Sequence, residues 1–156
     1  MRHFLILIVV VLLTSCDSSR VYEQQVDFDR AWIVADKPQF DFEIKDHTQV
    51  YNLYYTVRNS LDFPFSRIFV TYTLQDSTGV QLRQELVSNY LFDQKTGKPQ
   101  GSSGLGDLYD HRFPLVTNYQ FERPGVYSIT LEQFNRRDTL DGVLAVGARV
   151  ELASEK

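Results

Sequence analysis

The strongest constraint on the fold is a two-residue alternation of apolar and polar side chains that recurs after residue 26. The alternation is clearest over 40–44, 51–58, 68–74 and 146–152. It is typical of β-strands that bury one face, because successive side chains of a strand point to opposite sides of a sheet. An amphipathic helix would instead repeat its apolar side chains about every 3.6 residues. The sequence therefore predicts an all-β protein.

Short turn sequences separate these segments. DSTG at 76–79 and RPG at 123–125 are tight turns, and glycine and proline are frequent in a long loop over 95–107. The first turn predicts an antiparallel hairpin over 66–90. Four apolar residues of its second strand are expected to share one face: Val80, Leu82, Leu86 and Tyr90. Roughly seven to nine short strands predict an antiparallel β-sandwich over 26–156, of jelly-roll or immunoglobulin-like type.

The first sixteen residues have a different pattern. Arg2 and His3 precede ten consecutive apolar residues at 4–13. That run is too short to cross a bilayer as a helix, which takes about 20 residues, and it is typical of a signal peptide. It leads into LTSC at 13–16, in which small residues precede a cysteine as in a bacterial lipobox. The sequence predicts a signal peptide over 1–15 and a lipidated Cys16.

Lipidation of Cys16 would make the membrane the first partner of the mature protein. Its acyl chains would bury enough methylene groups for stable anchoring, at about 0.8 kcal/mol each. Polar residues follow, so we expect the lipidated cysteine and a short tether to occupy 16–25. The expected location is the cell envelope, with the outer membrane favoured over the inner one. The alternative is an incidental thiol at the end of a signal peptide that is cleaved elsewhere.

The charge balance and the residue types argue against several classes of partner and chemistry. Sixteen basic against twenty acidic side chains give a net charge of −4, unlike the basic surfaces that bind nucleic acid. One cysteine, one methionine and three histidines leave few ligands for a metal. His47 and His111 lie outside any metal-binding spacing, and we expect them at the surface or in loops. Neither a metal nor another cofactor is expected.

No sequence pattern predicts a catalytic residue. The glycine-rich stretch 101–106 lacks the lysine and the following helix of a phosphate-binding loop. Asp93, Asp107 and Asp110 form an acidic cluster in the sequence, but a calcium site needs about six to eight spaced oxygen ligands. A carboxylate pair for glycoside hydrolysis would meet only in the fold, so a hydrolase stays open as an alternative. The expectation is a protein that is not an enzyme.

Three aromatic side chains and one carboxylate are candidates for contact with a partner. Trp32, Tyr54 and Phe69 could form a row that stacks on sugars, although most aromatic residues of a β-sandwich belong to its core. Asp107 follows Gly106 before a predicted strand, where it either caps the loop or faces a partner. The possible partner contacts are therefore Asp107, Tyr54 and Trp32. A carbohydrate-binding lipoprotein of a polysaccharide-handling system is the alternative function.

Several ordered motifs run through the chain. They are YNLYYTVRN at 51–59, DFPFS at 62–66, GLGD at 104–107, RPGVY at 123–127 and the segment 142–151. Together with the lipobox they resemble the gliding-motility lipoprotein GldH family of the Bacteroidetes. This resemblance implies a lipid-anchored, non-enzymatic component of the envelope apparatus that moves adhesins along gliding cells, an apparatus linked to type IX secretion. Its expected partners are other envelope proteins, with no small-molecule substrate.

Overall fold

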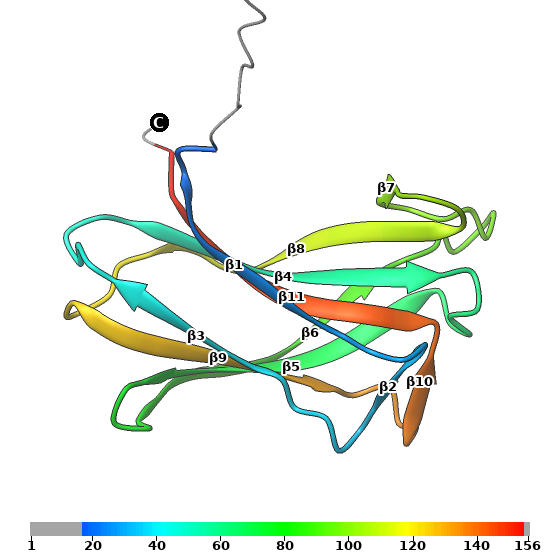
Figure 1. Ribbon diagram of the computed structural model, residues 1–156, viewed down its shortest axis with the longest axis horizontal. Helices are drawn as coiled ribbons and strands as arrows, with labels where there is room; N and C mark the ends of the chain where they lie inside the picture. Colours follow the sequence, from blue (N-terminus) through cyan, green and yellow to red (C-terminus); the bar gives the residue numbers. More distant parts are fainter. Residues whose placement is uncertain (1–16, 155–156) are drawn as a thin grey trace, which may run out of the picture.

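The computed structural model describes residues 17–154, which form eleven β-strands (Figure 1). The strands are β1 (Arg20–Asp27), β2 (Ala31–Ile33), β3 (Gln39–Ile44), β4 (Tyr51–Ser60), β5 (Arg67–Asp76), β6 (Gln81–Tyr90), β7 (Ser102–Ser103), β8 (Leu108–Tyr119), β9 (Gly125–Gln133), β10 (Thr139–Asp141) and β11 (Val143–Leu152). The predicted all-β class is confirmed. No helix within 17–154 is long and apolar enough to cross a membrane.

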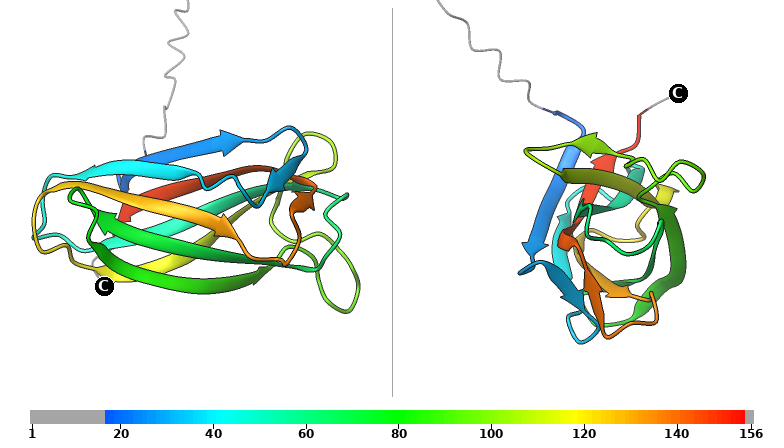
Figure 2. Two further views of the ribbon diagram at one scale, coloured as in Figure 1. Left: turned by 90° about the horizontal axis from the view of Figure 1, so that it is seen from below. Right: turned by 90° about the vertical axis from the view of Figure 1, so that its right-hand side faces the viewer.

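The strands form two larger sheets and one small one, and every pair is antiparallel. The five-stranded sheet has the order β1-β11-β4-β8-β7, and the four-stranded sheet has the order β3-β9-β5-β6. β10 pairs with β2 at one end of the molecule. The two larger sheets lie as opposing layers (Figure 2), which agrees with the expected antiparallel sandwich.

The core lies between these layers and follows from the alternation in the sequence. Every second residue of β4 is buried, and β5 buries a matching set that faces it. The largest fully buried side chains include Leu53 and Tyr55 of β4 and Ile68 and Tyr72 of β5. Each such side chain contributes about 1.5–3 kcal/mol of hydrophobic free energy. Burial of one face of each strand therefore accounts for the layered arrangement.

β1 begins earlier than the sequence indicates. Residues 16–25 were expected to be a tether before a domain starting at 26, yet pairing with β11 already begins at Arg20. Only part of β1 packs inward, with the Tyr22 ring 5.8 Å from that of Phe42. An edge strand with so few buried residues lacks the apolar alternation of a central strand. Of the expected tether, only residues 17–19 remain between Cys16 and the sheet. Cys16 itself lies outside the described residues.

The expected hairpin over 66–90 is present as β5 and β6. The face of β6 that points toward the core is not the face on which its apolar residues were expected to lie. Arg83 and Glu85 stand opposite the buried Leu74 and Tyr72, so they share the inward face. Leu86 is 52% exposed on the outer face. β6 is an edge strand, and inward-pointing charges are a common protection against pairing with another edge. Three of the apolar residues expected to form its apolar face are thus exposed: Val80, Leu82 and Leu86.

Candidate docking surfaces

The outer face of the five-stranded sheet carries a cluster of charged side chains around Arg149. This residue of β11 is buried, with 8% of its side chain exposed. Its Nη1 donates to Glu23 Oε2 of β1 at 2.7 Å, its Nε donates to Glu151 Oε1 at 2.5 Å, and it also binds Asp17. Hydrogen bonds between charged groups are shorter and stronger than those between neutral groups. The cluster therefore fastens the start of the described chain to the sheet.

The protonation states in this cluster follow from its contacts. The Ser19 hydroxyl and the Arg149 guanidinium hydrogen-bond to Asp17 and lower the pKa of its carboxyl group. Burial by itself would lower the pKa of Arg149, but its hydrogen bonds to Glu151 and Asp17 raise it overall. Asp17 and Arg149 are therefore both charged at neutral pH and form an ion pair.

Tyr54 lies on the same outer face and takes part in this network. The guanidinium carbon of Arg112 stands 5.2 Å from the centre of the Tyr54 ring, and Arg112 Nη1 donates to Glu151 Oε1 at 2.8 Å. The ring is half-buried. Tyr54 is one of the three partner contacts expected from the sequence, and it is an accessible aromatic side chain in a charged surface. Its contact with a partner stays a prediction.

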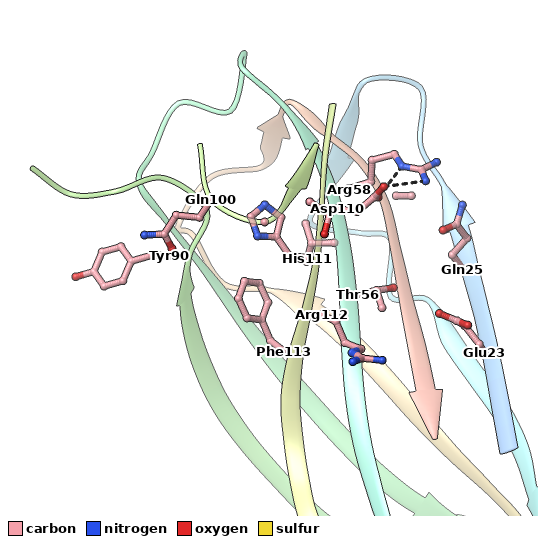
Figure 3. A pocket seen from close by; sticks show the side chains of 14 residues that line it. Glu23, Gln25, Thr56, Arg58, Tyr90, Gln100, Asp110, His111, Arg112 and Phe113 are labelled. Carbon is pink, nitrogen blue, oxygen red and sulfur yellow. Dashed lines mark hydrogen bonds and ion pairs between the residues drawn. The ribbon is translucent and has the colours of Figure 1, made fainter. Parts of the chain in front are cut away.

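A pocket of about 610 Å³ extends around β8 beside this face (Figure 3). On one side of the strand, Asp110 accepts hydrogen bonds from Arg58, with Arg58 Nε 2.8 Å from Asp110 Oδ1. On the other side, His111 and Phe113 point toward Gln100. Because adjacent residues of β8 point to opposite faces, the lining side chains do not converge on one point. The arrangement suits contact with a surface better than chemistry on a small molecule.

His111 is buried, so its expected place at the surface or in a loop is wrong. Its Nε2 donates to Asn59 Oδ1 at 2.8 Å, and Asn59 is fully buried. Gly101 closes over the ring, since a Cβ on this residue would lie 2.7 Å from His111 Nδ1. Burial lowers the pKa of His111 to about 4. The imidazole is therefore neutral at physiological pH.

This neutral histidine predicts a loss of stability in mild acid. The unfolded chain binds a proton at His111 near pH 6.5, whereas the folded protein binds it only near pH 4. Acidification through this window favours the unfolded state by up to about 3 kcal/mol. Urea unfolding at pH 7 and pH 4.5 should show this loss in the wild type and a smaller loss in His111→Gln. An equal pH dependence of the two proteins would contradict the assignment.

Asp107 lies in an exposed loop beside Leu105, which is 93% exposed. Gly106 between them has φ 70°, which explains the glycine before Asp107. The acidic residues near this loop do not form a cluster. Asp93 accepts backbone hydrogen bonds from Lys95 and Thr96 at 2.9 and 2.8 Å, and Asp110 pairs with Arg58. Within residues 17–154 no group of three or more histidine, cysteine or acidic side chains could hold a metal ion.

Trp32 is fully buried, which places it outside any contact surface of the described chain. Its Nε1 donates to the backbone oxygen of Asp36 at 2.8 Å, and its ring stacks on Phe28 with centroids 5.7 Å apart. The expectation that Trp32 contacts a partner is therefore corrected. Tyr54 and Phe69 lie on the outer faces of different sheets. The three rings do not form a row on which a sugar could stack.

A second surface, on the outer face of the four-stranded sheet, was missed by the sequence reasoning. A groove of about 600 Å³ there is lined by aromatic residues from separate elements, among them Phe65, Phe69 and Phe134, together with Arg67 and Arg136. The exposed Leu86 of β6 belongs to it as well. Its signal in the sequence is weak, because these residues come from segments that only the sheet order β9-β5-β6 brings together.

Comparison with known proteins gives matches over most of the chain. A family model described as GldH lipoprotein matches residues 20–150. The gliding motility lipoprotein GldH homolog of Christiangramia forsetii is 26% identical over 158 residues, which cover 95% of this chain and 93% of the relative. The gliding motility lipoprotein GldH of Flavobacterium johnsoniae is 25% identical over 154 residues, which cover 94% of each chain.

A solved structure of the infectious bursal disease virus VP2 subviral particle gives a TM-score of 0.38 at 12% identity. The match covers 87% of this chain and 32% of the viral chain, so this chain spans about a third of the length of the viral protein. The family match, by contrast, extends from the first strand to the last, through both large sheets. It confirms the resemblance seen in the sequence motifs. The chain belongs to the GldH lipoprotein family.

Proposed function

We propose that this chain is a non-catalytic, lipid-anchored docking protein of the gliding-motility machinery, held at the outer membrane and linked in its action to type IX secretion. The observation that carries the proposal is the match of nearly the whole sandwich to relatives named gliding motility lipoproteins. Membership of a lipoprotein family also supports a lipid-anchored envelope protein. The sandwich contributes two large outer faces to which other envelope proteins can bind.

The mechanism we propose is tethering at short range. Lipid on Cys16 would be followed by only 17–19 before β1, and the four residues 16–19 span at most about 14 Å. Asp17 is bound to Arg149, which places the entry of the chain at the outer face of the five-stranded sheet. The domain is thereby restricted to a thin layer at the membrane, where its effective concentration toward membrane-bound partners is high.

The carbohydrate-binding alternative loses its structural basis, because Trp32 is buried and Tyr54 and Phe69 lie on opposite faces. The hydrolase alternative would need two carboxylates converging in a cleft. In the pocket around β8, Asp110 is instead paired with Arg58, and Glu23 is paired with Arg149. Docking without turnover is the function that the geometry supports best.

Deletion of the gene in its host tests the proposal. We expect loss of colony spreading and reduced release of proteins secreted by the type IX system, with both restored by the wild-type gene. Growth rate serves as the control for a general envelope defect. Normal spreading and normal secretion in the deletion strain would refute the role in motility, and conversion of a substrate by the purified lipoprotein would refute a non-catalytic role.

A further inference from the structure

The groove on the four-stranded sheet combines exposed apolar surface with arginine side chains. Phe134 and Leu86 are each 52% exposed, and Phe65 is 36% exposed. Arg67 and Arg136 line the groove, and the guanidinium carbon of Arg137 stands 5.8 Å from the centre of the Phe65 ring. Aromatic residues and arginine are the types enriched at the centres of protein interfaces. The composition of the groove is therefore that of a binding surface.

The charge of the groove is opposite to that of the whole chain. The chain carries a net charge of −4, yet no aspartate or glutamate lines the groove. Within residues 17–154, Arg67, Arg136 and Arg137 take part in none of the ion pairs. In contrast, Arg58, Arg112 and Arg149 on the opposite sheet are all paired with carboxylates. Three arginines that form no ion pair within the described residues, beside exposed aromatic rings, favour an occupant with negative charge.

The groove is also held in shape before anything binds. Asn135 Oδ1 accepts from the Phe69 backbone NH at 2.9 Å, and Asn135 Nδ2 donates to the Arg67 backbone oxygen at 3.1 Å. These two bonds fix the loop that carries Phe134 and Arg136 against β5. Arg67 is hydrogen-bonded to the Tyr90 hydroxyl, and its guanidinium carbon stands 4.3 Å from the centre of that ring. A preformed surface loses little conformational entropy when it binds.

The position of the groove favours a protein over the membrane as its occupant. The described chain begins at the outer face of the five-stranded sheet, where Asp17 binds Arg149. β1 and the strands β5 and β6 lie on opposite sides of the sandwich when it is viewed end-on (Figure 2, right). A domain anchored by fewer than five residues beside β1 therefore presents β5 and β6 away from the membrane that holds it.

We propose that this groove binds an acidic segment of a partner protein that inserts an aromatic or branched aliphatic side chain between Phe65, Phe134 and Leu86. Carboxylates of the segment pair with Arg67, Arg136 and Arg137, in the bidentate geometry that guanidinium groups favour. The inference rests on the proposed docking function and deepens it, since it names the docking face and the chemistry of the partner.

Site-specific crosslinking in living cells tests the assignment. The full-length lipoprotein would carry p-benzoylphenylalanine in place of Phe134, and the crosslinked peptide would be identified by mass spectrometry. Val126 is the matched control position, because it lies on the outer face of the same sheet and is 47% exposed. We expect an adduct at position 134 at least tenfold above that at 126, on a protein segment rich in aspartate or glutamate. An adduct on phospholipid, on a second copy of this chain or on a basic segment would overturn the proposal, as would equal yields at the two positions.

Charge-reversal variants test the assignment of the groove independently of the proposed overall function. Arg136→Glu should reduce the adduct at least tenfold and abolish spreading, while Arg123→Glu, which changes an exposed arginine near Val126 by the same charge, should leave both unchanged. Immunoblots of the membrane fraction would establish that both variants are present at wild-type levels. If the deletion strain fails to spread but Arg136→Glu spreads normally, the groove assignment fails while the proposed function stands.

Discussion

Replacement of Cys16 by serine is expected to move the protein from the membrane fraction to the soluble fraction almost completely. A serine hydroxyl does not accept the diacylglycerol group that a lipobox cysteine receives through its sulfur. Each methylene of an acyl chain contributes about 0.8 kcal/mol of membrane binding, so loss of the chains removes most of the attachment. The prediction applies to Cys16→Ser protein whose signal peptide has been removed at another site, and the mass of the purified protein establishes that removal.

Fractionation and immunoblotting of cells that express each protein measure this result. Ser18→Ala provides the matched control, since Ser18 is a small exposed residue just beyond the expected anchor and should leave the protein in the membrane. Lipid attached to the wild-type amino terminus should also be visible by mass spectrometry. A fully processed Cys16→Ser protein that sediments with membranes as the wild type does would show that the anchor lies elsewhere.

Replacement of Trp32 by alanine is expected to destabilise the fold by about 3–5 kcal/mol, the usual range for removing a buried tryptophan. The side chain is fully buried, stacks on Phe28 and satisfies the backbone oxygen of Asp36. A domain of this size has a free energy of unfolding of only about 5–15 kcal/mol, so the variant would lose a large part of its stability. Urea unfolding of the full-length protein in detergent, followed by tryptophan-independent far-UV circular dichroism, measures the change.

The matched control for this prediction is Tyr54→Ala, which removes a half-buried ring from an outer face and should cost clearly less. A change within about 0.5 kcal/mol for Trp32→Ala would contradict the buried position. Because Trp32 belongs to the core, Trp32→Ala is not a suitable variant for testing sugar binding. Loss of an affinity in Trp32→Ala would report unfolding, whereas loss in Tyr54→Ala or Phe69→Ala with unchanged stability would report a surface site.

The strands that the sequence predicts well are those with one continuous buried face. β3 and β4 alternate strictly, and β5 alternates except at the buried Thr73, because each strand packs one face against the opposite layer. β1 escaped prediction because its side chains are mostly exposed and its pairing with β11 involves the backbone. The sequence predicts β6 as a strand but does not predict which of its faces points inward. An edge strand can carry apolar residues on its outer face and charged residues on its inner face. Local pattern thus identifies central strands and is ambiguous at edges.

The candidate surfaces depend on contacts between residues far apart in the sequence. His111 is buried because Gly101 closes over it, which neither residue type indicates. Phe65 and Phe134 come together only because β9 pairs with β5. By contrast, the family could be inferred from ordered motifs, because these follow the chain itself. The sequence therefore predicts membership of the family and most of the framework, whereas the faces available for docking require the fold.

If the sandwich acts by being held at the membrane, colony spreading must depend on the lipid anchor. The measurement compares strains whose sole copy of the gene encodes the wild type or Cys16→Ser, with folded protein at equal abundance in the envelope. We expect that cells with the soluble variant do not spread, although the groove and the charged face of that variant are intact. Spreading equal to that of the wild type would contradict it, because docking would then need no anchor.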